Sequence, residues 1–151
     1  MLQAPLFAII NLYKITGGQP AAASESRKDK SYADPHENVS AEINTLGAEL
    51  VSFKGDDGFE HIWQGDPKYW GGHAPVLFPI VGALRNGRTR IKGEWYEMNR
   101  HGFVRRREFT VAEKREDAVS LVIESDAETK KQYPFDFRLT VSYALAGSSI
   151  T

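Results

Sequence analysis

Apolar and polar residues alternate in short runs along most of this chain, with the period of two that is typical of half-buried β-strands. Val39, Ala41 and Ile43 alternate with polar neighbours, and a second run follows over residues 48–54. A Gly-Asp-Asp-Gly sequence ends this second run. The pattern therefore predicts a β-hairpin at the start of the ordered part of the chain.

The middle of the chain predicts a second hairpin. Residues 88–98 form two arms that meet at a Lys-Gly pair, and Ile91 and Trp95 are the expected buried partners. The apolar run that precedes this hairpin is flanked or interrupted by Pro75 and Pro79. Because proline cannot donate a ladder hydrogen bond, we expect an edge strand or an irregular strand there.

The last third of the chain continues the strand pattern. Residues 107–114 and 118–125 predict a third hairpin, and residues 136–145 alternate regularly as one long strand. Only residues 126–132 favour a helical turn. The chain is therefore predicted to be all-β, and a β-sandwich is the expected architecture.

The long final strand is followed by a glycine turn and only four further residues. A strand without a full partner exposes a row of backbone donors and acceptors. We therefore expect the sandwich to be incomplete in this chain, as the N-terminal part of a longer domain. An open sheet edge would also allow a homo-oligomer.

Composition changes the picture at the N-terminal end. Residues 17–37 are mostly small, polar or charged, so residues 1–37 are predicted to be a flexible segment and residues 38–151 one domain. The apolar run at residues 5–13 is far shorter than the roughly 20 residues of a membrane helix. With no cysteine and no targeting signal, the default expectation is a cytoplasmic protein without a membrane partner.

Charge gives one local signal. The net charge is −1, yet residues 81–107 hold seven arginines and one lysine against two glutamates. This basic segment is also compatible with a nucleic-acid-binding β domain, in which Trp95 and Phe103 would stack against bases. Acidic residues elsewhere balance the charge, so we expect no nucleic-acid partner.

Five ordered blocks at compatible spacing carry a family resemblance. They are Asn44-Thr-Leu-Gly-Ala-Glu-Leu50, Trp63-Gln-Gly-Asp66 with Trp70, Ala74-Pro-Val-Leu-Phe-Pro-Ile-Val-Gly82, His101-Gly-Phe103 with Arg105, and Tyr133-Pro-Phe135 with Phe137. From residue 38 to 151 the chain resembles the aldose 1-epimerase (galactose mutarotase-like) family, especially its bacterial branch with His-Gly-Phe-x-Arg. The resemblance implies a β-sandwich of the supersandwich type with a sugar site on one concave face.

The resemblance also implies roles for particular residues. It gives His101 and Arg105 to sugar binding, while the family's acid histidine and base glutamate fall beyond Thr151, so the catalytic residues are unknown. Many relatives have a sugar-contacting arginine where this chain has Ala83. Arg85, two residues later, would share that face if the segment were a strand.

The residues themselves leave alternatives open. Histidine is the residue type whose unperturbed side chain suits proton exchange near neutral pH, which makes His101 a candidate, but a histidine beside a glycine also fixes turns. The guanidinium of Arg105 suits vicinal hydroxyls or a phosphate, and in an extended chain it shares a face with Phe103. Trp70 and Phe103 are candidate stacking surfaces for a pyranose, although aromatic residues of a sandwich are usually core.

We therefore predict a mutarotase-like, sugar-binding protein that interconverts the α and β anomers of a hexose or hexose phosphate. Because the family's acid and base are not on this chain, isomerase activity is uncertain and we expect it to be weak or absent. The alternative is a non-catalytic carbohydrate-binding module or remnant. No metal-ligand spacing and no phosphate-binding glycine loop is present, so no metal and no cofactor are expected.

Overall fold

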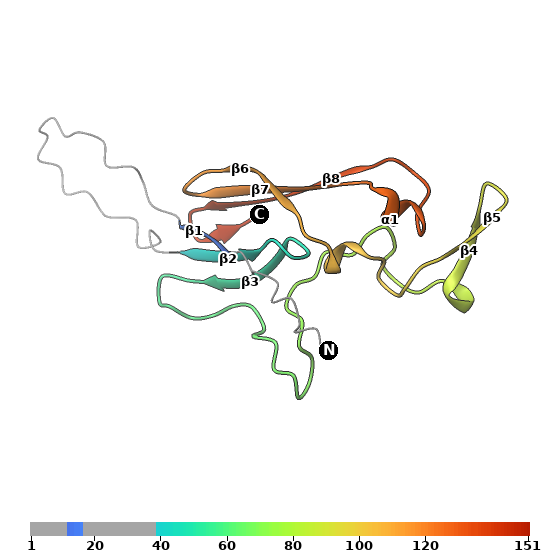
Figure 1. Ribbon diagram of the computed structural model, residues 1–151. Helices are drawn as coiled ribbons and strands as arrows, with labels where there is room; N and C mark the ends of the chain where they lie inside the picture. Colours follow the sequence, from blue (N-terminus) through green and yellow to red (C-terminus); the bar gives the residue numbers. More distant parts are fainter. Residues whose placement is uncertain (1–11, 17–38) are drawn as a thin grey trace, which may run out of the picture.

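The computed structural model describes residues 12–16 and 39–151, and within them two antiparallel sheets face each other (Figure 1). The first sheet has the order β1-β2-β3, with β1 at Leu12–Thr16, β2 at Ser40–Asn44 and β3 at Glu49–Lys54. The predicted hairpin of residues 39–54 is confirmed as the β2–β3 pair. The strand β1, which pairs with β2, was not predicted.

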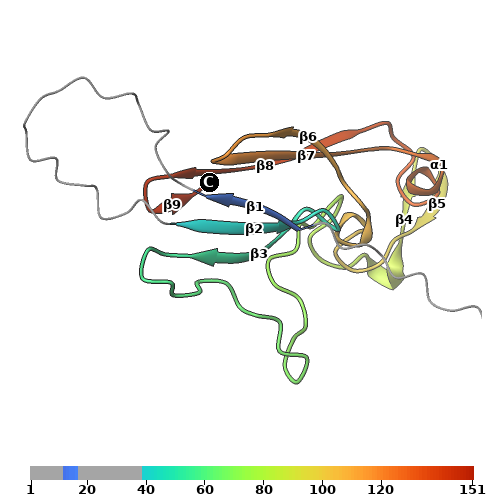
Figure 2. The same ribbon diagram turned by 60° about the vertical axis from the view of Figure 1, so that its left-hand side comes forward.

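The second sheet has the order β6-β7-β8-β9. It contains the predicted third hairpin, β6 at Thr110–Lys114 and β7 at Ala118–Glu124, and the predicted long strand, β8 at Arg138–Ala146. The short strand β9 at Ser149–Ile150 pairs with the end of β8. Figure 2 shows this sheet lying over β1, β2 and β3 in a second view. The all-β sandwich prediction is therefore confirmed.

The core lies between the two sheets because each contributes one apolar face. Ala41 and Ile43 on β2 and Leu121 on β7 are fully buried, as the period of two requires. A hydrogen bond also joins the sheets, since the Tyr143 hydroxyl donates to the carbonyl of Ala48 over 2.9 Å. Burial of the phenol, with the Glu49 charge nearby, raises the pKa of Tyr143.

The second predicted hairpin is confirmed as β4 at Arg88–Ile91 and β5 at Glu94–Glu97. It stands away from the two sheets, at the far end of the molecule from β3 (Figures 1 and 2). The prediction that Trp95 is buried is therefore wrong, because the hairpin has no facing layer and the indole is 57% exposed. The Arg88 guanidinium covers its ring instead, 4.6 Å from the centroid.

The helical turn predicted at residues 126–132 is confirmed as the short helix α1 at Ala127–Lys130. Asp126 caps it by accepting from the Thr129 backbone N–H, and the Thr129 hydroxyl accepts from the Asp126 N–H in return. The Thr129 N–H, together with the positive charge of Arg107, lowers the pKa of Asp126. No helix in the described part of the chain is long enough to cross a membrane.

Long irregular connections fill the space beside the sheets. Between Lys54 and Arg85 the structure has turns and single bridges but neither a helix nor a named strand, which confirms the irregular course expected around Pro75 and Pro79. Two 3₁₀ turns follow, η1 at Arg85–Gly87 and η2 at Val104–Arg106. Apart from β1, the predicted flexible segment 1–37 lies outside the described residues.

Candidate functional site

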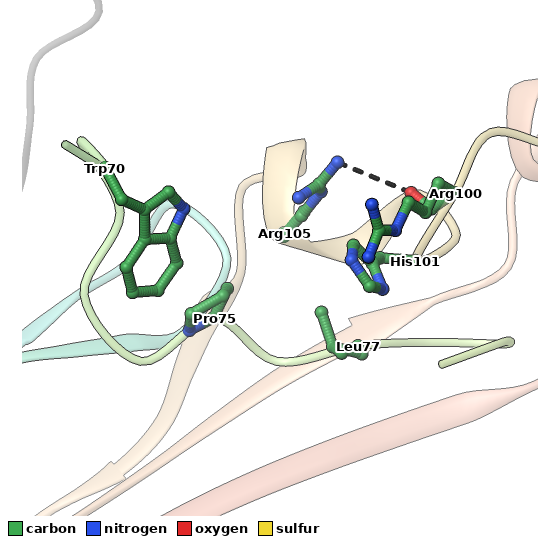
Figure 3. Close-up of a pocket in the computed structure, with 6 residues that line it drawn as sticks. All are labelled: Trp70, Pro75, Leu77, Arg100, His101 and Arg105. Carbon is green, nitrogen blue, oxygen red and sulfur yellow. Dashed lines mark hydrogen bonds between the residues drawn. The ribbon is translucent and has the colours of Figure 1, made fainter. Parts of the chain in front are cut away.

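A hollow of about 580 Å³ opens where the irregular connection passes η2 (Figure 3). Two segments that are about 25 residues apart in the sequence meet there. The lining residues are Trp70, Pro75, Leu77, Arg100, His101 and Arg105. Three of the five predicted site residues, Trp70, His101 and Arg105, are thus brought together.

His101 is fixed by hydrogen bonds to the preceding connection. Its backbone N–H donates to the carbonyl of Gly82 over 2.9 Å, and its ring Nδ1 contacts the carbonyl of Val81. A carbonyl only accepts, so Nδ1 donates this bond, and whenever the ring is neutral its acceptor lone pair is on Nε2. These bonds fit the reading of His101 as a residue that fixes a turn, and His101 also lines the hollow, while its contact with a sugar stays a prediction.

Gly102 allows the close approach that builds this turn. Its φ is +70°, in the left-handed region that favours glycine, and it pairs with Phe78 in a parallel bridge. A Cβ at this position would lie 2.8 Å from the nitrogen of Pro79 and closer still to the carbonyl of Phe78. The N–H of Phe103 donates to that same carbonyl over 3.0 Å. The glycine therefore holds the histidine against the connection.

Arg105 lies on η2, whose backbone packs against the turn before β3. A Cβ on Gly47 would lie 2.9 Å from the carbonyl oxygen of Arg105, so this glycine also permits a close approach. The guanidinium makes one long hydrogen bond, from Nη2 to the carbonyl of Arg100 at 3.4 Å. Its Nε is buried and has no hydrogen-bond partner among the described residues. A buried donor without a partner is rare in proteins.

Trp70 faces Arg105 and His101 across the hollow (Figure 3). Its ring lies over Gly72, where an added Cβ would come within 2.7 Å of an indole carbon. The indole N–H of Trp63 donates to the backbone carbonyl of Trp70 over 2.7 Å and holds the segment in place. Half of the Trp70 surface stays exposed, so a ring face is open to a ligand.

The structure places the other two predicted site residues outside the hollow. Phe103 is 7% exposed and packs edge-on against Phe78 in an aromatic cluster of the core. Arg85 begins η1, which is exposed, so the strand geometry that would align it with residue 83 does not occur.

The extended conformation in which Arg105 would share a face with Phe103 does not occur. Residues 104–106 form η2, which buries Val104 and turns Arg105 into the hollow. Arg107 pairs with Asp126, while Arg106 is exposed.

Three lining residues were missed by reasoning from the sequence. Pro75 and Leu77 form the floor between Trp70 and the basic residues (Figure 3), and their spacing of two was the available signal. Arg100 precedes His101 directly, but nothing in the pattern distinguished it from the other arginines of the basic segment.

The hollow combines an apolar floor, an exposed indole face and a wall of nitrogen donors. Neither aspartate nor glutamate is among the six lining residues. Within the described part of the chain, no group of three or more His, Asp or Glu side chains is arranged to hold a metal ion. The lining of the hollow is therefore suited to bind a small polar ligand that has both an apolar face and oxygen acceptors.

Comparisons with known proteins identify relatives of this chain. The family model described as aldose 1-epimerase matches residues 30–151. Protein LacX (plasmid) of Lactococcus lactis is 42% identical over 120 residues, which are 76% of this chain and 40% of that protein.

Two solved structures are similar as well. A galactose mutarotase related enzyme from Lactobacillus acidophilus is 39% identical, with a TM-score of 0.71 over 72% of this chain and 37% of its own. A galactose mutarotase-like protein from Lactobacillus casei is 37% identical, with a TM-score of 0.72 over 74% of this chain and 38% of its own. The chain thus spans about 40% of the length of the curated relatives that it matches.

Proposed function

Because the chain belongs to the aldose 1-epimerase family, we propose that the hollow at Trp70, His101 and Arg105 binds an aldose and that the chain serves the interconversion of its anomers. The single observation that carries this proposal is the convergence of these three residues, from two distant segments, on one hollow. An aldose in its pyranose form has an apolar ring face for the indole and hydroxyl groups for the nitrogen donors.

Each residue then has a distinct part in binding. Trp70 covers the apolar face of the sugar ring, and the guanidinium of Arg105 donates to hydroxyl or ring oxygens. The tautomer set by Val81 leaves Nε2 of His101 to accept from a hydroxyl group. The apolar side chains of Pro75 and Leu77 form the floor of the hollow and exclude water from that side of the bound sugar.

Anomer exchange needs more than binding. One group must take the proton of the anomeric hydroxyl and another must protonate the ring oxygen, so that the ring opens and closes again. His101 is the only histidine among the six lining residues, and none of them is a carboxylate. We therefore propose that these residues bind and orient the sugar and that the acid–base pair is not formed by them alone.

The binding proposal is tested by titrating galactose and glucose into the chain while recording tryptophan fluorescence. Trp70→Ala and Arg105→Ala should each weaken binding at least tenfold, about 1.4 kcal/mol, because each loses a direct contact. Trp95→Ala and Arg106→Ala are the matched controls, since both side chains are exposed and neither lines the hollow. Equal effects of the site and control variants would rule out this hollow as the sugar site.

A non-catalytic carbohydrate-binding role is the second candidate, and the lack of a carboxylate in the lining favours it. Polarimetry of freshly dissolved α-galactose separates the two roles. A rate of optical change that exceeds the spontaneous rate and falls in His101→Ala supports catalysis. Binding without any acceleration supports the second role for these 151 residues.

A further inference from the structure

A second hollow of about 470 Å³, the hairpin hollow, lies at the base of the protruding β4–β5 hairpin. Its walls come from three separate segments: η1, the end of β5 with the two residues that follow it, and the residue two places after α1. Figures 1 and 2 show the hairpin and α1 at the same end of the molecule. The lining residues are Asn86, Gly87, Glu97, Met98, Asn99 and Gln132, none of which lines the hollow at Trp70.

The backbone holds two of these walls side by side. Met98 is 5% exposed and belongs to the core, and its N–H donates to the carbonyl of Gly87 over 2.9 Å. This bond ties η1 to the segment that carries Glu97 and Asn99, both of which are exposed. Asn86 has a φ of +56°, in the left-handed region where asparagine is enriched. Residues held in such conformations cluster at sites that grip a ligand.

The amide side chains of the hairpin hollow have unused hydrogen-bonding groups. In the described part of the chain, Asn86, Asn99 and Gln132 form no side-chain hydrogen bond with another residue. Each amide has two N–H donors and a carbonyl acceptor, so one amide can bind a hydroxyl group both as donor and as acceptor. Three of them around one hollow can therefore bind several hydroxyl groups of the same molecule.

Glu97 carries the only charge among the six lining residues, and it forms no ion pair within the described ranges. Arg88 lies directly opposite it in the register of the hairpin, but the Arg88 guanidinium covers the ring of Trp95, 4.6 Å from the centroid. Lys130 and Lys131, close to the third wall, pair with other carboxylates. The carboxylate of Glu97 is thus available to a cation from solution.

The size and the donors of the hairpin hollow decide which kind of cation fits. Carboxylate and amide oxygens also bind Ca²⁺, but they do so at about 2.3–2.6 Å and would leave most of the 470 Å³ empty. A metal ion also makes no use of the amide N–H donors. A six-membered ring with polar substituents suits a hollow of this size and uses donors and acceptors alike. The lining therefore favours an organic cation that carries its own oxygen atoms.

We propose that the hairpin hollow is a second binding site, for a small amine that carries several hydroxyl groups, the chemistry of an amino sugar. The protonated amine lies at Glu97, and the hydroxyl groups pair with the amides of Asn86, Asn99 and Gln132. This proposal is independent of the function proposed for the hollow at Trp70, since the two hollows share no lining residue.

The test follows the side-chain NH₂ resonances of Asn86, Asn99 and Gln132 by ¹H–¹⁵N NMR, each assigned from its loss in the corresponding alanine variant. Galactosamine, galactose, galacturonate and CaCl₂ are titrated at about pH 6, where an amine is protonated. Galactosamine should shift all three resonances and bind about fivefold more tightly than galactose, the upper range for an exposed ion pair. Galacturonate should bind no more tightly than galactose, because Glu97 repels its charge.

Two matched variants locate the effect. Glu97→Gln removes the charge while nearly keeping the size of the side chain, so it should abolish the preference for galactosamine over galactose. Glu94→Gln is the control, since Glu94 is exposed on the same strand but does not line the hairpin hollow. Trp70→Ala should retain the shifts of the three amides, because Trp70 belongs to the other hollow.

Several results would overturn the proposal. Equal binding of galactosamine and galactose, or a preference that survives in Glu97→Gln, would show that the carboxylate does not recognise an amine. Ca²⁺ that shifts the three resonances while galactosamine leaves them unchanged would replace the organic cation by a metal ion. If no probe shifts them, the hairpin hollow is not a binding site for this class of ligand.

Discussion

Substituting Gly102 by alanine tests the close approach that builds the site. Gly102 has a φ of +70° and lies against the Phe78 carbonyl, with no room for a side chain. An L-residue in the left-handed region costs about 1–2 kcal/mol. Relief of the clash must also move the Phe78 carbonyl away, which weakens the 3.0 Å hydrogen bond from the Phe103 N–H and costs about 0.5–1.5 kcal/mol more. We expect a loss of about 1.5–3.5 kcal/mol in the free energy of unfolding.

Gly87→Ala is the matched control for Gly102→Ala. Its φ is +67°, nearly the same, but an added Cβ would meet nothing within 4 Å. This variant should therefore lose only the backbone contribution of about 1–2 kcal/mol. The difference between the two variants isolates the contact with Phe78.

The measurement is urea unfolding of the parent chain and both variants, followed by tryptophan fluorescence. An unchanged slope with a lower midpoint shows that stability, and not the compactness of either state, has changed. Gly102→Ala should also weaken sugar binding, because it displaces the adjacent His101. Identical midpoints for the two variants, or full sugar affinity in Gly102→Ala, would refute this account of the turn.

Three further predictions concern the sandwich itself. Leu121→Ala, at a fully buried position of β7, should lower the free energy of unfolding by about 2–5 kcal/mol, whereas Val81→Ala, at a 70% exposed position, should change it by less than about 0.5 kcal/mol in urea titrations. Tyr143→Phe should cost about 0.5–1.5 kcal/mol through the lost bond to the facing sheet. Because the pKa of Tyr143 is raised in the folded chain, the parent should lose more stability than this variant as pH rises above about 10. Burial alone would raise the pKa of Glu60, but hydrogen bonds from the Ser52 hydroxyl and two backbone N–H groups outweigh it and lower the pKa. The stability that Glu60 contributes is thus present above pH 4.5 and lost below it, so the difference in urea midpoint between the parent and Glu60→Gln should shrink on acidification.

Alternation of apolar residues was sufficient to predict the two-sheet sandwich. Ala41, Ile43 and Leu121 are buried where the period of two places them, because a strand in a sandwich has one face on the core and one on solvent. The same rule was wrong for Trp95, since alternation shows which residues share a face but not whether another layer covers that face.

The site was predicted only in part. The motif of residues 100–107 and the resemblance indicated His101 and Arg105, and reasoning about aromatic stacking indicated Trp70. The structure brings these three residues to one hollow, and their contact with a sugar stays a prediction. Reasoning from the sequence considered strand geometry for residues that form 3₁₀ turns. It offered Phe103 both as a stacking surface and as a core residue, and the structure buries it in the core.

What the sequence by itself determined is the class of fold, the family and the segment in which the basic residues cluster, because these depend on local order along the chain. Only the tertiary structure decided which residues meet. Gly102 brings residue 101 against the connection at Val81, and Gly47 brings the backbone of Arg105 against the turn before β3. These contacts join residues about 20 to 60 positions apart, and no pattern of neighbouring residues encodes such distances.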